Sequence, residues 1–239
     1  MKIQNSIIVP AYNEEKRSGS FIPLLLSYVK KHIPHSEVLI VNDGSKDNTV
    51  AVVNAFIKKT NTGSFAKVIG YSVNKGKGNA VTYGVHAAKG QKVLFIDADG
   101  SIAPDEIPRM LEKLDSYEVV VGDRHSARSK VKTTIIRKIT SLGFNSLVSL
   151  IFQYSYRDNL CGFKGFTRKA ANVLFSDLKD RRWVFDVELF FKIKRKYFSL
   201  YFLPIKWHHV EGSKISLFKD SIKWFARLVT LRFQLINYR

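Results

Sequence analysis

Short apolar runs alternate with longer amphipathic stretches over the first half of the chain. Runs such as "SIIVP" (6–10), "EVLIV" (37–41) and "KVLFID" (92–97) are rich in Val, Ile and Leu and are typical of buried strands. Between them, "FIPLLLSYVKKH" (21–32) and "NTVAVVNAFIKK" (48–59) have apolar residues at helical spacing. This alternation predicts an α/β fold with a mostly parallel central sheet and helices on both faces.

The second half of the chain has a less regular pattern. "EVVVGDR" (118–124) is predicted to be one more strand, and "HSARSKVKTT" (125–134) a polar, basic loop. Apolar residues at helical spacing predict a helix over 135–154. "YFLPIKW" (201–207) is predicted to be a late strand, and 216–238 a terminal helix.

The terminal helix has two apolar stripes at about 100° per residue. One stripe consists of Phe218, Ile222, Phe225, Val229, Phe233 and Ile236. The other consists of Leu217, Trp224, Leu228, Leu231 and Leu235. Two stripes predict that one packs on the domain and the other rests on a lipid surface, whereas a fully buried core helix is the alternative.

The positive charge is concentrated in the second half. The chain has 239 residues and a net charge of +19. Residues 1–120 contain 15 basic against 12 acidic residues, and 121–239 contain 24 against 8, giving balances of +3 and +16. Such a surface attracts anions, whether nucleic acid, acidic lipid or a phosphorylated substrate.

Composition and pattern also suggest where the protein works and how it is divided. The start of the chain does not resemble a leader peptide, no apolar run approaches the roughly 18 residues of a membrane span, and Cys161 is the single cysteine. We therefore expect a cytoplasmic protein without a transmembrane segment. We expect a catalytic domain over 1–210, with halves 1–120 and 121–210, and a membrane-surface helix within 211–239.

Polar motifs follow each of the first four predicted strands, the third of which is "AKVIGYS" (66–72): "PAYNEE" (10–15), "NDGS" (42–45), "NKGKG" (74–78) and "DADGS" (97–101). The glycines of "NKGKG" are expected to serve a tight turn. Ligands of α/β sheets bind beyond the carboxyl ends of the strands. Carboxylates at i and i+2, such as those in "DADGS", project from the same side of an extended chain and can meet one cation. Hard oxygen ligands favour Mg²⁺ or Mn²⁺, whereas a solvated acidic turn is the alternative.

Together these motifs resemble a known enzyme family. "PAYNEE", "VNDGSKDNT" (41–49) and "DADG" resemble the nucleotide-pocket motifs of family 2 glycosyltransferases, which have the GT-A fold. In the second half, "NLCGFKGFTRKAA" (159–171), "RRWVFDVELF" (181–190) and "WHHVEGSKIS" (207–216) resemble dolichyl-phosphate β-glucosyltransferases. The resemblance covers nearly the whole chain, and its second set of motifs is the more specific.

On the donor side, the resemblance implies a nucleotide-sugar pocket at the strand ends. The residues that would frame the nucleoside are Pro10, Tyr12 and Glu14. Asp43 would hydrogen-bond the base, and Asp97 would contact the ribose or the metal shell. Asp99 would be the direct ligand of Mg²⁺ or Mn²⁺, which would neutralise the departing nucleoside diphosphate.

On the acceptor side, the resemblance implies a site for a lipid phosphate. Arg124 occupies the position of an acceptor-binding arginine, and Arg137 and Ser141 fit the R-x-x-x-S pattern of related transferases. Lys214 could touch either phosphate. Arginine pairs with phosphate through two parallel hydrogen bonds, which suits this role.

Three residues would carry the chemistry: Asp99, Arg124 and, within "RRWVFDVELF", Asp186. The resemblance suggests that Asp186 faces the sugar or the acceptor, whereas a carboxylate at a helix N-terminus is the alternative. A phosphate acceptor is ionised at neutral pH, so the reaction needs little help from a general base.

The sequence therefore predicts a metal-dependent, inverting enzyme that moves glucose from UDP-glucose to dolichyl or another polyprenyl phosphate. It would work at the anionic cytoplasmic face of a membrane, without an obligate protein partner and without binding nucleic acid. A GDP-mannose enzyme of the same design is one alternative. A second alternative is transfer to a saccharide acceptor, with Asp186 as the general base. A third is a non-catalytic, basic protein that binds nucleic acid, but the acidic strand ends would repel the phosphates of the nucleic acid.

Overall fold

The structure of the chain is a computed structural model. The residues that it describes are 2–132, 135–154, 156, 158–208, 210, 221–236 and 238. For 132, 135–140 and 221–223 it describes the backbone without the side chains.

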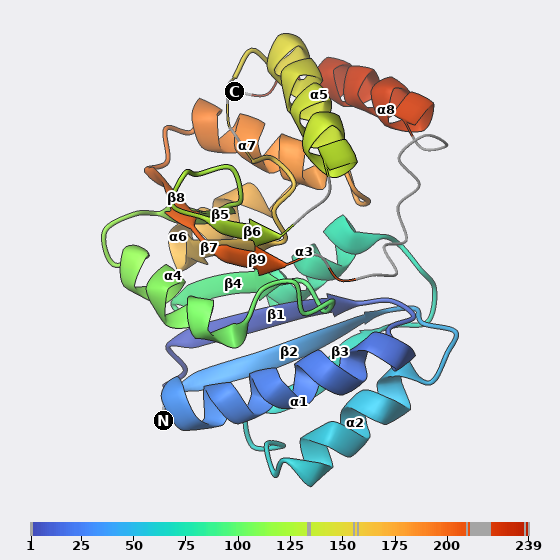
Figure 1. The fold of residues 1–239 in the computed structure, drawn as a ribbon, viewed down its shortest axis with the longest axis vertical. Coiled ribbons are helices and arrows are strands. Elements are labelled where there is room, and N and C mark those ends of the chain that lie inside the picture. The colour runs from blue at the N-terminus through green and yellow to red at the C-terminus, as the bar shows by residue number, and fades with distance from the viewer. Residues whose placement is uncertain are drawn as a thin grey trace.

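A seven-stranded sheet with the order β3-β2-β1-β4-β7-β5-β8 forms the centre of the molecule (Figure 1). Its strands are β1 (Asn5–Ala11), β2 (Ser36–Asp43), β3 (Ala66–Tyr71), β4 (Lys92–Ile96), β5 (Val119–Asp123), β7 (Phe163–Thr167) and β8 (Leu200–Pro204). Every neighbouring pair is parallel except the two pairs that β7 makes with β4 and β5. The predicted mostly parallel sheet is confirmed. A small separate ladder joins β6 (Lys130–Lys132) to β9 (Lys206–His208).

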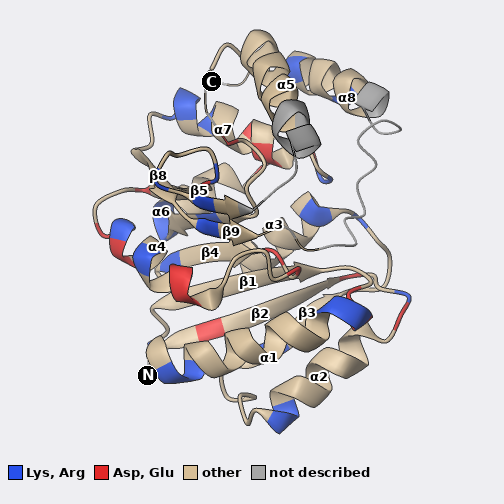
Figure 2. Cartoon of the chain, viewed as in Figure 1, with Lys and Arg blue, Asp and Glu red and all other residues tan. Residues whose placement is uncertain are grey.

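Helices lie on both faces of this sheet, as α1 on the near side and α3 on the far side show in Figure 1. The helices are α1 (Glu15–His32), α2 (Thr49–Lys59), α3 (Lys77–Ala87), the 3₁₀ turn η1 (Pro104–Glu106), α4 (Ile107–Lys113), α5 (Ile135–Phe152), α6 (Arg168–Leu174), α7 (Phe185–Arg195) and α8 (Ser221–Gln234). Helix α1 packs on α2, α3 on α6 and α6 on α7, while α5 packs on α8. Figure 2 shows basic residues on α6, α7, β9 and α8, which belong to the basic second half.

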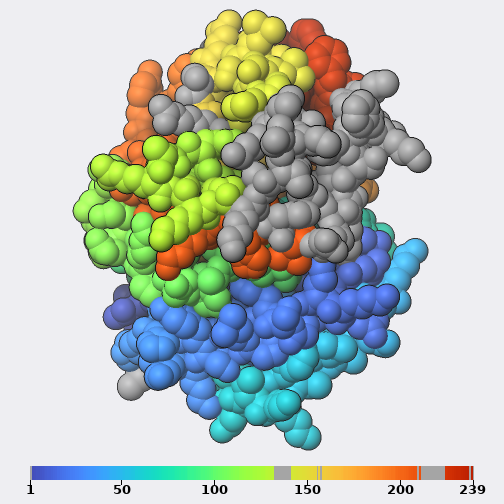
Figure 3. Space-filling view, in the orientation of Figure 1, coloured from blue at the N-terminus to red at the C-terminus, as the bar shows by residue number. Residues whose placement is uncertain are grey.

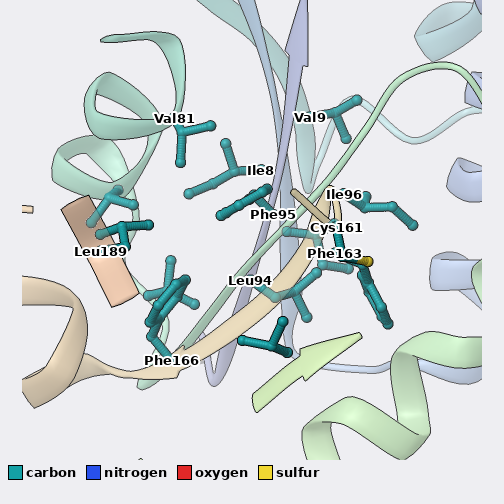
Figure 4. Packing of buried hydrophobic residues seen from close by; sticks show 14 of the residues in the cluster. Ile8, Val9, Val81, Leu94, Phe95, Ile96, Cys161, Phe163, Phe166 and Leu189 are labelled. Carbon is teal, nitrogen blue, oxygen red and sulfur yellow. The ribbon is translucent and has the colours of Figure 1, made fainter. Parts of the chain in front are cut away.

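The core lies on both sides of the central strands (Figure 4). Ile8 of β1 and Phe95 of β4 point toward Val81 of α3 and Leu189 of α7, and all four side chains are at most 1% exposed. Strands buried on both faces read as continuous apolar runs, which is why the pattern alone predicted them.

The carboxyl ends of the parallel strands meet at one edge of the sheet, and the start of β7 reaches the same edge because that strand runs the other way. The backbone N–H of Asp97, just after β4, donates to the carbonyl oxygen of Gly162, just before β7, at 3.0 Å. Residues that precede β7 therefore border the strand-end loops that the sequence singled out.

Several elements differ from the prediction. Helix α1 begins at Glu15 rather than at 21. The sequence did not reveal this first part of the helix because the polar residues before Phe21 have no apolar periodicity. Strands β6 and β7 and helices α4, α6 and α7 were not predicted, and β6 falls within the expected loop 125–134. The single strand predicted over 201–207 is divided into β8 and β9. The terminal helix ends at Gln234 rather than at 238, and the expected first residues, 216–220, lie outside the described part of the chain.

Helix α8 uses its two apolar stripes differently. Leu228, Leu231 and Leu235 are fully buried, whereas Phe233 is 67% and Ile236 54% exposed. One stripe therefore packs on the domain, with Trp224 half-buried beside these leucines, while contact of the other stripe with lipid stays a prediction. Among the described residues, no helix combines the length and apolar character needed to cross a membrane.

Candidate functional site

Asp97 and Asp99 lie at the carboxyl end of β4. The Asp97 Oδ1 atom is 2.6 Å from the Lys77 ammonium group, and the Asp97 side chain is about one-third exposed. The Asp99 Oδ1 atom accepts a hydrogen bond from the backbone of Ser101 at 2.9 Å, and Gly100 supplies the positive φ of 75° that this turn requires. The two carboxylates therefore sit at the sheet edge on a short turn.

Negative charge exceeds positive charge around Asp97. Burial raises the pKa of Asp97, Lys77 opposes that rise, and the carboxylates of Asp99 and Asp186 add to it. Burial alone would lower the pKa of Lys77, but the charge of Asp97, with Asp186 and Asp99 behind it, raises it above its usual value. Three carboxylates thus act on Lys77, and Lys164 already compensates Asp186. Lys77 alone does not balance Asp97 and Asp99, and their surplus negative charge favours a further cation.

Lys77 reaches Asp97 because the loop before α3 is held in place. The Asp43 carboxylate, at the end of β2, is only 3% exposed. It accepts hydrogen bonds from the backbone of Lys75 at 2.8 Å and Gly76 at 2.9 Å, and from the Asn74 side chain at 2.9 Å. Asp43 therefore supports the loop in this structure, and its predicted contact with a base stays a prediction.

The residues expected to frame the nucleoside lie at the end of β1 and just beyond it. Pro10 and Tyr12 are half-buried, and Glu14 is buried. The Glu14 carboxylate pairs with Arg17, and its backbone N–H donates to the hydroxyl of Thr49 at 2.8 Å. The edge thus brings β1, β2 and β4 residues of the predicted donor pocket together, while their roles remain predictions.

Arg124 directly follows β5 and is fixed by Asp158. Its Nε and a terminal nitrogen donate to the two oxygens of that carboxylate at 2.8 and 2.7 Å. Asp158 is 1% and Arg124 22% exposed, and Trp207 lies under the guanidinium at 5.6 Å. Although burial opposes both charges, each lies within the field of the other, so the pKa of Arg124 is raised and that of Asp158 lowered. Asp97 also contributes to the raised pKa of Arg124, so the charges of the two strand ends act on each other.

Other predicted acceptor residues are placed only in part. The hydroxyl of Ser141, on α5, is 3.3 Å from Nε2 of His125, the residue after Arg124. Arg137 lies one turn earlier on α5, but its side chain is outside the described part of the structure, as is the whole of Lys214. The structure therefore brings Ser141 toward the end of β5 and leaves the other two untested.

Asp186 is buried at the start of α7 and has a dedicated partner. Its Oδ1 atom accepts a hydrogen bond from the ammonium group of Lys164 at 2.7 Å, and the two side chains are 4% and 0% exposed. The same ammonium group donates to the carbonyl oxygen of Cys161 at 2.6 Å. Asp186 still lies close enough to raise the pKa of Lys77, so it borders the carboxylate cluster from the interior.

Three residues of this site were not predicted: Lys77, Asp158 and Lys164. For Lys77 a signal existed, since "NKGKG" follows a strand end, but its glycines were interpreted only as turn residues. The pairs Arg124–Asp158 and Lys164–Asp186 join residues 34 and 22 positions apart, which no periodic pattern encodes.

Because Gly162 has no side chain, it leaves room for the Asp97 carboxylate, and the substitution Gly162→Ala should fill that room. A Cβ atom on Gly162 would lie 1.8 Å from Asp97 Oδ2, so the carboxylate would have to turn away from Lys77. Since a displacement of about 1 Å in a reacting site can cost about 100-fold, we expect kcat/KM to fall by roughly that factor. Steady-state kinetics on the purified variant measures this.

Gly63→Ala is the matched control, because its Cβ atom would meet nothing nearer than Ile57 at 3.8 Å. We expect it to retain normal kinetics. Normal activity in a folded Gly162→Ala variant would show that the position of the Asp97 carboxylate does not matter.

The carboxylates fit a divalent cation that a substrate helps to hold. Among the described residues, no group of three or more His, Cys, Asp or Glu side chains is arranged to enclose a metal. Mg²⁺ commonly binds through one or two carboxylates, with waters and substrate phosphates as its remaining ligands. Asp99 and Asp97 match that arrangement, and Lys77 already neutralises part of the charge of Asp97.

Comparison with known proteins identifies the family to which the chain belongs. The family model "Glycosyl transferase family 2" matches residues 6–175. The chain therefore belongs to glycosyl transferase family 2, as the resemblance of its motifs predicted.

The curated relatives are more specific than the family. The dolichyl-phosphate beta-glucosyltransferase of Saccharomyces cerevisiae is 34% identical over 95% of this chain and 73% of its own length. The human dolichyl-phosphate beta-glucosyltransferase is 32% identical over 98% of this chain and 76% of its own length. The chain is thus a glycosyltransferase that resembles the dolichyl-phosphate β-glucosyltransferases.

Solved structures establish the fold as GT-A. Glucosyl-3-phosphoglycerate synthase from Mycobacterium tuberculosis, in complex with Mn²⁺, UDP-glucose and phosphoglyceric acid, matches with a TM-score of 0.71. The match covers 96% of this chain and 78% of the synthase at 19% identity. The same synthase in complex with Mg²⁺ and UDP matches with a TM-score of 0.68 at 16% identity.

Proposed function

We propose that this protein transfers glucose from UDP-glucose to dolichyl or another polyprenyl phosphate, with inversion to a β-linked product. One observation carries the proposal: the end of β4, with Asp97 and Asp99, and the end of β5, with Arg124, share one sheet edge in a chain 34% identical to a dolichyl-phosphate β-glucosyltransferase. Two anionic groups, a donor diphosphate and an acceptor phosphate, must approach each other in this reaction. Neighbouring cationic groups on that edge suit this need.

Lys77 is the protein's own cation on the donor side. Its ammonium group lies at the N-terminus of α3, where the helix dipole adds partial positive charge. In the proposed complex, Lys77 and a divalent cation on Asp99 offset the charge of the diphosphate. Such a cation, when bound, stabilises the departing nucleoside diphosphate. The Mn²⁺ and Mg²⁺ complexes of the structural neighbour support this assignment by analogy of fold.

Arg124 is the proposed anchor of the acceptor phosphate. Asp158 holds the guanidinium through two hydrogen bonds, which still leaves donors of the five that the group has. Because the lipid phosphate is ionised near neutral pH, its oxygen can attack the anomeric carbon without losing a proton to the protein. Asp186, bound to Lys164, would then act through its charge on Lys77 rather than as a general base.

Helices α5 and α8 are the proposed contact with the membrane that contains the acceptor. They pack on each other and form the surface at one end of the molecule (Figure 3). Leu142 and Leu150 of α5 and Phe225 and Phe233 of α8 are exposed apolar side chains. The basic second half adds attraction to anionic headgroups, about 1 kcal/mol for each basic residue near the surface. We place the protein on the cytoplasmic face, where UDP-glucose would be available to it.

Substituting both exposed phenylalanines of α8 should weaken membrane binding. Burying one such side chain in an apolar medium is worth about 1.5–3 kcal/mol, so Phe225→Ser with Phe233→Ser should lower partitioning more than about tenfold. Flotation with vesicles of neutral and anionic phospholipid at low salt measures the bound fraction.

The control for this experiment is Leu24→Ser, which removes an equally exposed apolar side chain from α1. It should float like the unmodified protein. An intact protein that stays at the bottom of the gradient, or a double variant that floats normally, would contradict the proposed membrane surface.

The donor is tested directly with purified protein, polyprenyl phosphate and a panel of labelled nucleotide sugars. We expect label to move into the lipid fraction from UDP-glucose in preference to the others. Efficient transfer from GDP-mannose without transfer from UDP-glucose would overturn the sugar assignment. Transfer only to added saccharides would overturn the acceptor assignment.

A further inference from the structure

Arg227 of α8 connects this surface helix to the interior. Its Nε atom donates to Oδ2 of Asp180 at 2.5 Å, and a terminal nitrogen donates to the carbonyl oxygen of Lys179 at 3.1 Å. Arg227 is 34% exposed, whereas the Asp180 side chain is 3% exposed. The bond therefore joins the outer helix to a buried carboxylate of the loop before α7.

Asp180 organises that loop. Its other oxygen, Oδ1, accepts hydrogen bonds from the backbone of Arg182 at 2.8 Å and Val184 at 3.2 Å. The backbone N–H groups of Lys179 and Asp180 both donate to the buried Glu188 carboxylate of α7 at 2.8 Å. The shape of residues 179–184 thus depends on the bonds of Asp180 together with those of Glu188.

The same loop caps the N-terminus of α3. The backbone N–H of Gly78 donates to the carbonyl oxygen of Arg182 at 3.0 Å, and that of Asn79 to the carbonyl oxygen of Arg181 at 2.9 Å. A Cβ atom on Gly76 would lie 2.7 Å from the Arg181 carbonyl oxygen, and one on Gly78 would lie 2.8 Å from Phe185. The glycines of "NKGKG" therefore permit the close approach of this loop, which adds to the turn role that the sequence suggested.

Lys77 lies between Gly76 and Gly78, the two glycines that this loop approaches closely. Its ammonium group is 2.6 Å from Asp97 Oδ1 and 5.7 Å from the centre of the Trp183 ring in the capping loop. A shift of residues 181–183 would move both the backbone on either side of Lys77 and the ring against its ammonium group.

We propose that Arg227 is a positioning residue for the donor site. Through Asp180 and the capping loop 181–183, the membrane-facing helix α8 fixes the N-terminus of α3 and holds the Lys77 ammonium group on Asp97. The kinetic part of this inference rests on the proposed transfer from UDP-glucose, whereas the structural part does not. When α8 packs on the domain and Arg227 binds Asp180, the Lys77 ammonium group is thereby held on Asp97.

The chain offers a matched control in Arg232. This residue also anchors α8, since its Nε atom donates to the carbonyl oxygen of Ile151 on α5 at 3.1 Å. It has no contact with the capping loop among the bonds of the described residues. Arg227→Met and Arg232→Met thus each remove one anchoring arginine from α8, and only the first interrupts the connection to α3.

The experiment measures two quantities in both variants with acceptor presented in detergent micelles, so that membrane binding does not contribute. One is the hydrogen-exchange rate of the Gly78 and Asn79 amides, followed by NMR. The other is the KM for UDP-glucose. In Arg227→Met, we expect faster exchange at both amides and an at least about fivefold higher KM, the lower range of coupling between sites. Arg232→Met should match the unmodified protein, and Arg227→Lys should restore part of the loss.

Asp180→Asn guards against an effect of misfolding. The asparagine keeps a carbonyl oxygen for Arg182 and Val184 but loses the charge that Arg227 binds, so it should reproduce the Arg227→Met result, and combining the two should add little. Unchanged amide exchange in Arg227→Met, or the same acceleration in Arg232→Met, would overturn the inference. If the unmodified protein does not transfer glucose, the proposed function fails, and the exchange measurement alone still decides the role of Arg227.

Discussion

Asp99→Ala is expected to lower the transfer rate more than 100-fold while leaving the fold intact. Asp99 is half-buried, and among the described residues its Oδ1 atom bonds only to the backbone of Ser101, in its own turn. Loss of the proposed carboxylate ligand should remove several kcal/mol of leaving-group stabilisation, and each 1.4 kcal/mol is about a factor of ten. Rate assays with Mg²⁺ or Mn²⁺, together with a thermal unfolding curve, measure both parts.

Asp115→Ala is the control for this variant. Asp115 is 67% exposed and pairs with Lys92, the first residue of β4, at the end of the strand opposite Asp97 and Asp99. We expect it to retain normal activity, and we expect excess EDTA to inhibit the unmodified protein as strongly as Asp99→Ala does. Full activity in EDTA, or in the folded Asp99→Ala variant, would contradict a metal at these carboxylates.

Arg124→Ala is expected to raise the KM for the lipid phosphate more than the KM for UDP-glucose, and also to destabilise the protein. Its removal leaves Asp158, which is 1% exposed, as an unpaired buried carboxylate. Breaking a buried pair in this way typically costs about 3–5 kcal/mol. Steady-state kinetics with each substrate varied, and denaturant unfolding, separate the two effects.

A second substitution distinguishes the role of Arg124 in acceptor binding from its role in stability. Arg124→Ala with Asp158→Asn removes the unpaired charge, so the free energy of unfolding should recover while the KM for the lipid phosphate stays high. Arg128→Ala removes an exposed arginine from the following loop and should change neither quantity greatly. An equal loss toward both substrates in the double variant would exclude Arg124 as the acceptor anchor.

The sheet and its ligand-bearing edge could be predicted from the sequence because both depend on local patterns. Buried strands such as β1 and β2 are short, continuous apolar runs, and polar motifs follow them directly. The positions of Asp97 and Asp99 at the end of β4 follow from the same pattern. Because these strands are buried on both faces, nearly all of their residues are apolar, and a continuous apolar run in the sequence therefore indicates such a strand.

Strand β7 could not be predicted because its second residue breaks that rule. Lys164 is fully buried within "FKGFT", where a charged residue ordinarily indicates a solvent-facing position. Its charge is compensated by Asp186 on α7 and by the carbonyl oxygen of Cys161. The strand is recognisable only once that partner is known, and the partner comes from a distant part of the chain.

The roles of Asp43 and Lys77 show the same limit within the site. The expected hydrogen bond from Asp43 to the base stays a prediction, but its carboxylate also supports the loop before α3, which in turn carries Lys77 to Asp97. A motif places a residue at a strand end, but it does not say whether neighbouring backbone N–H groups will bind that residue first.

The anomeric configuration of the lipid product distinguishes the proposed transfer from its alternatives. Purified protein is incubated with UDP-glucose, dolichyl phosphate and a divalent cation, and the lipid product is analysed by NMR for its anomeric configuration. We expect a glucosyl phosphate lipid with a β-linkage, formed by a single displacement on the α-linked donor. An α-linked product, or no glucose in the lipid fraction while another acceptor is glucosylated, would contradict it.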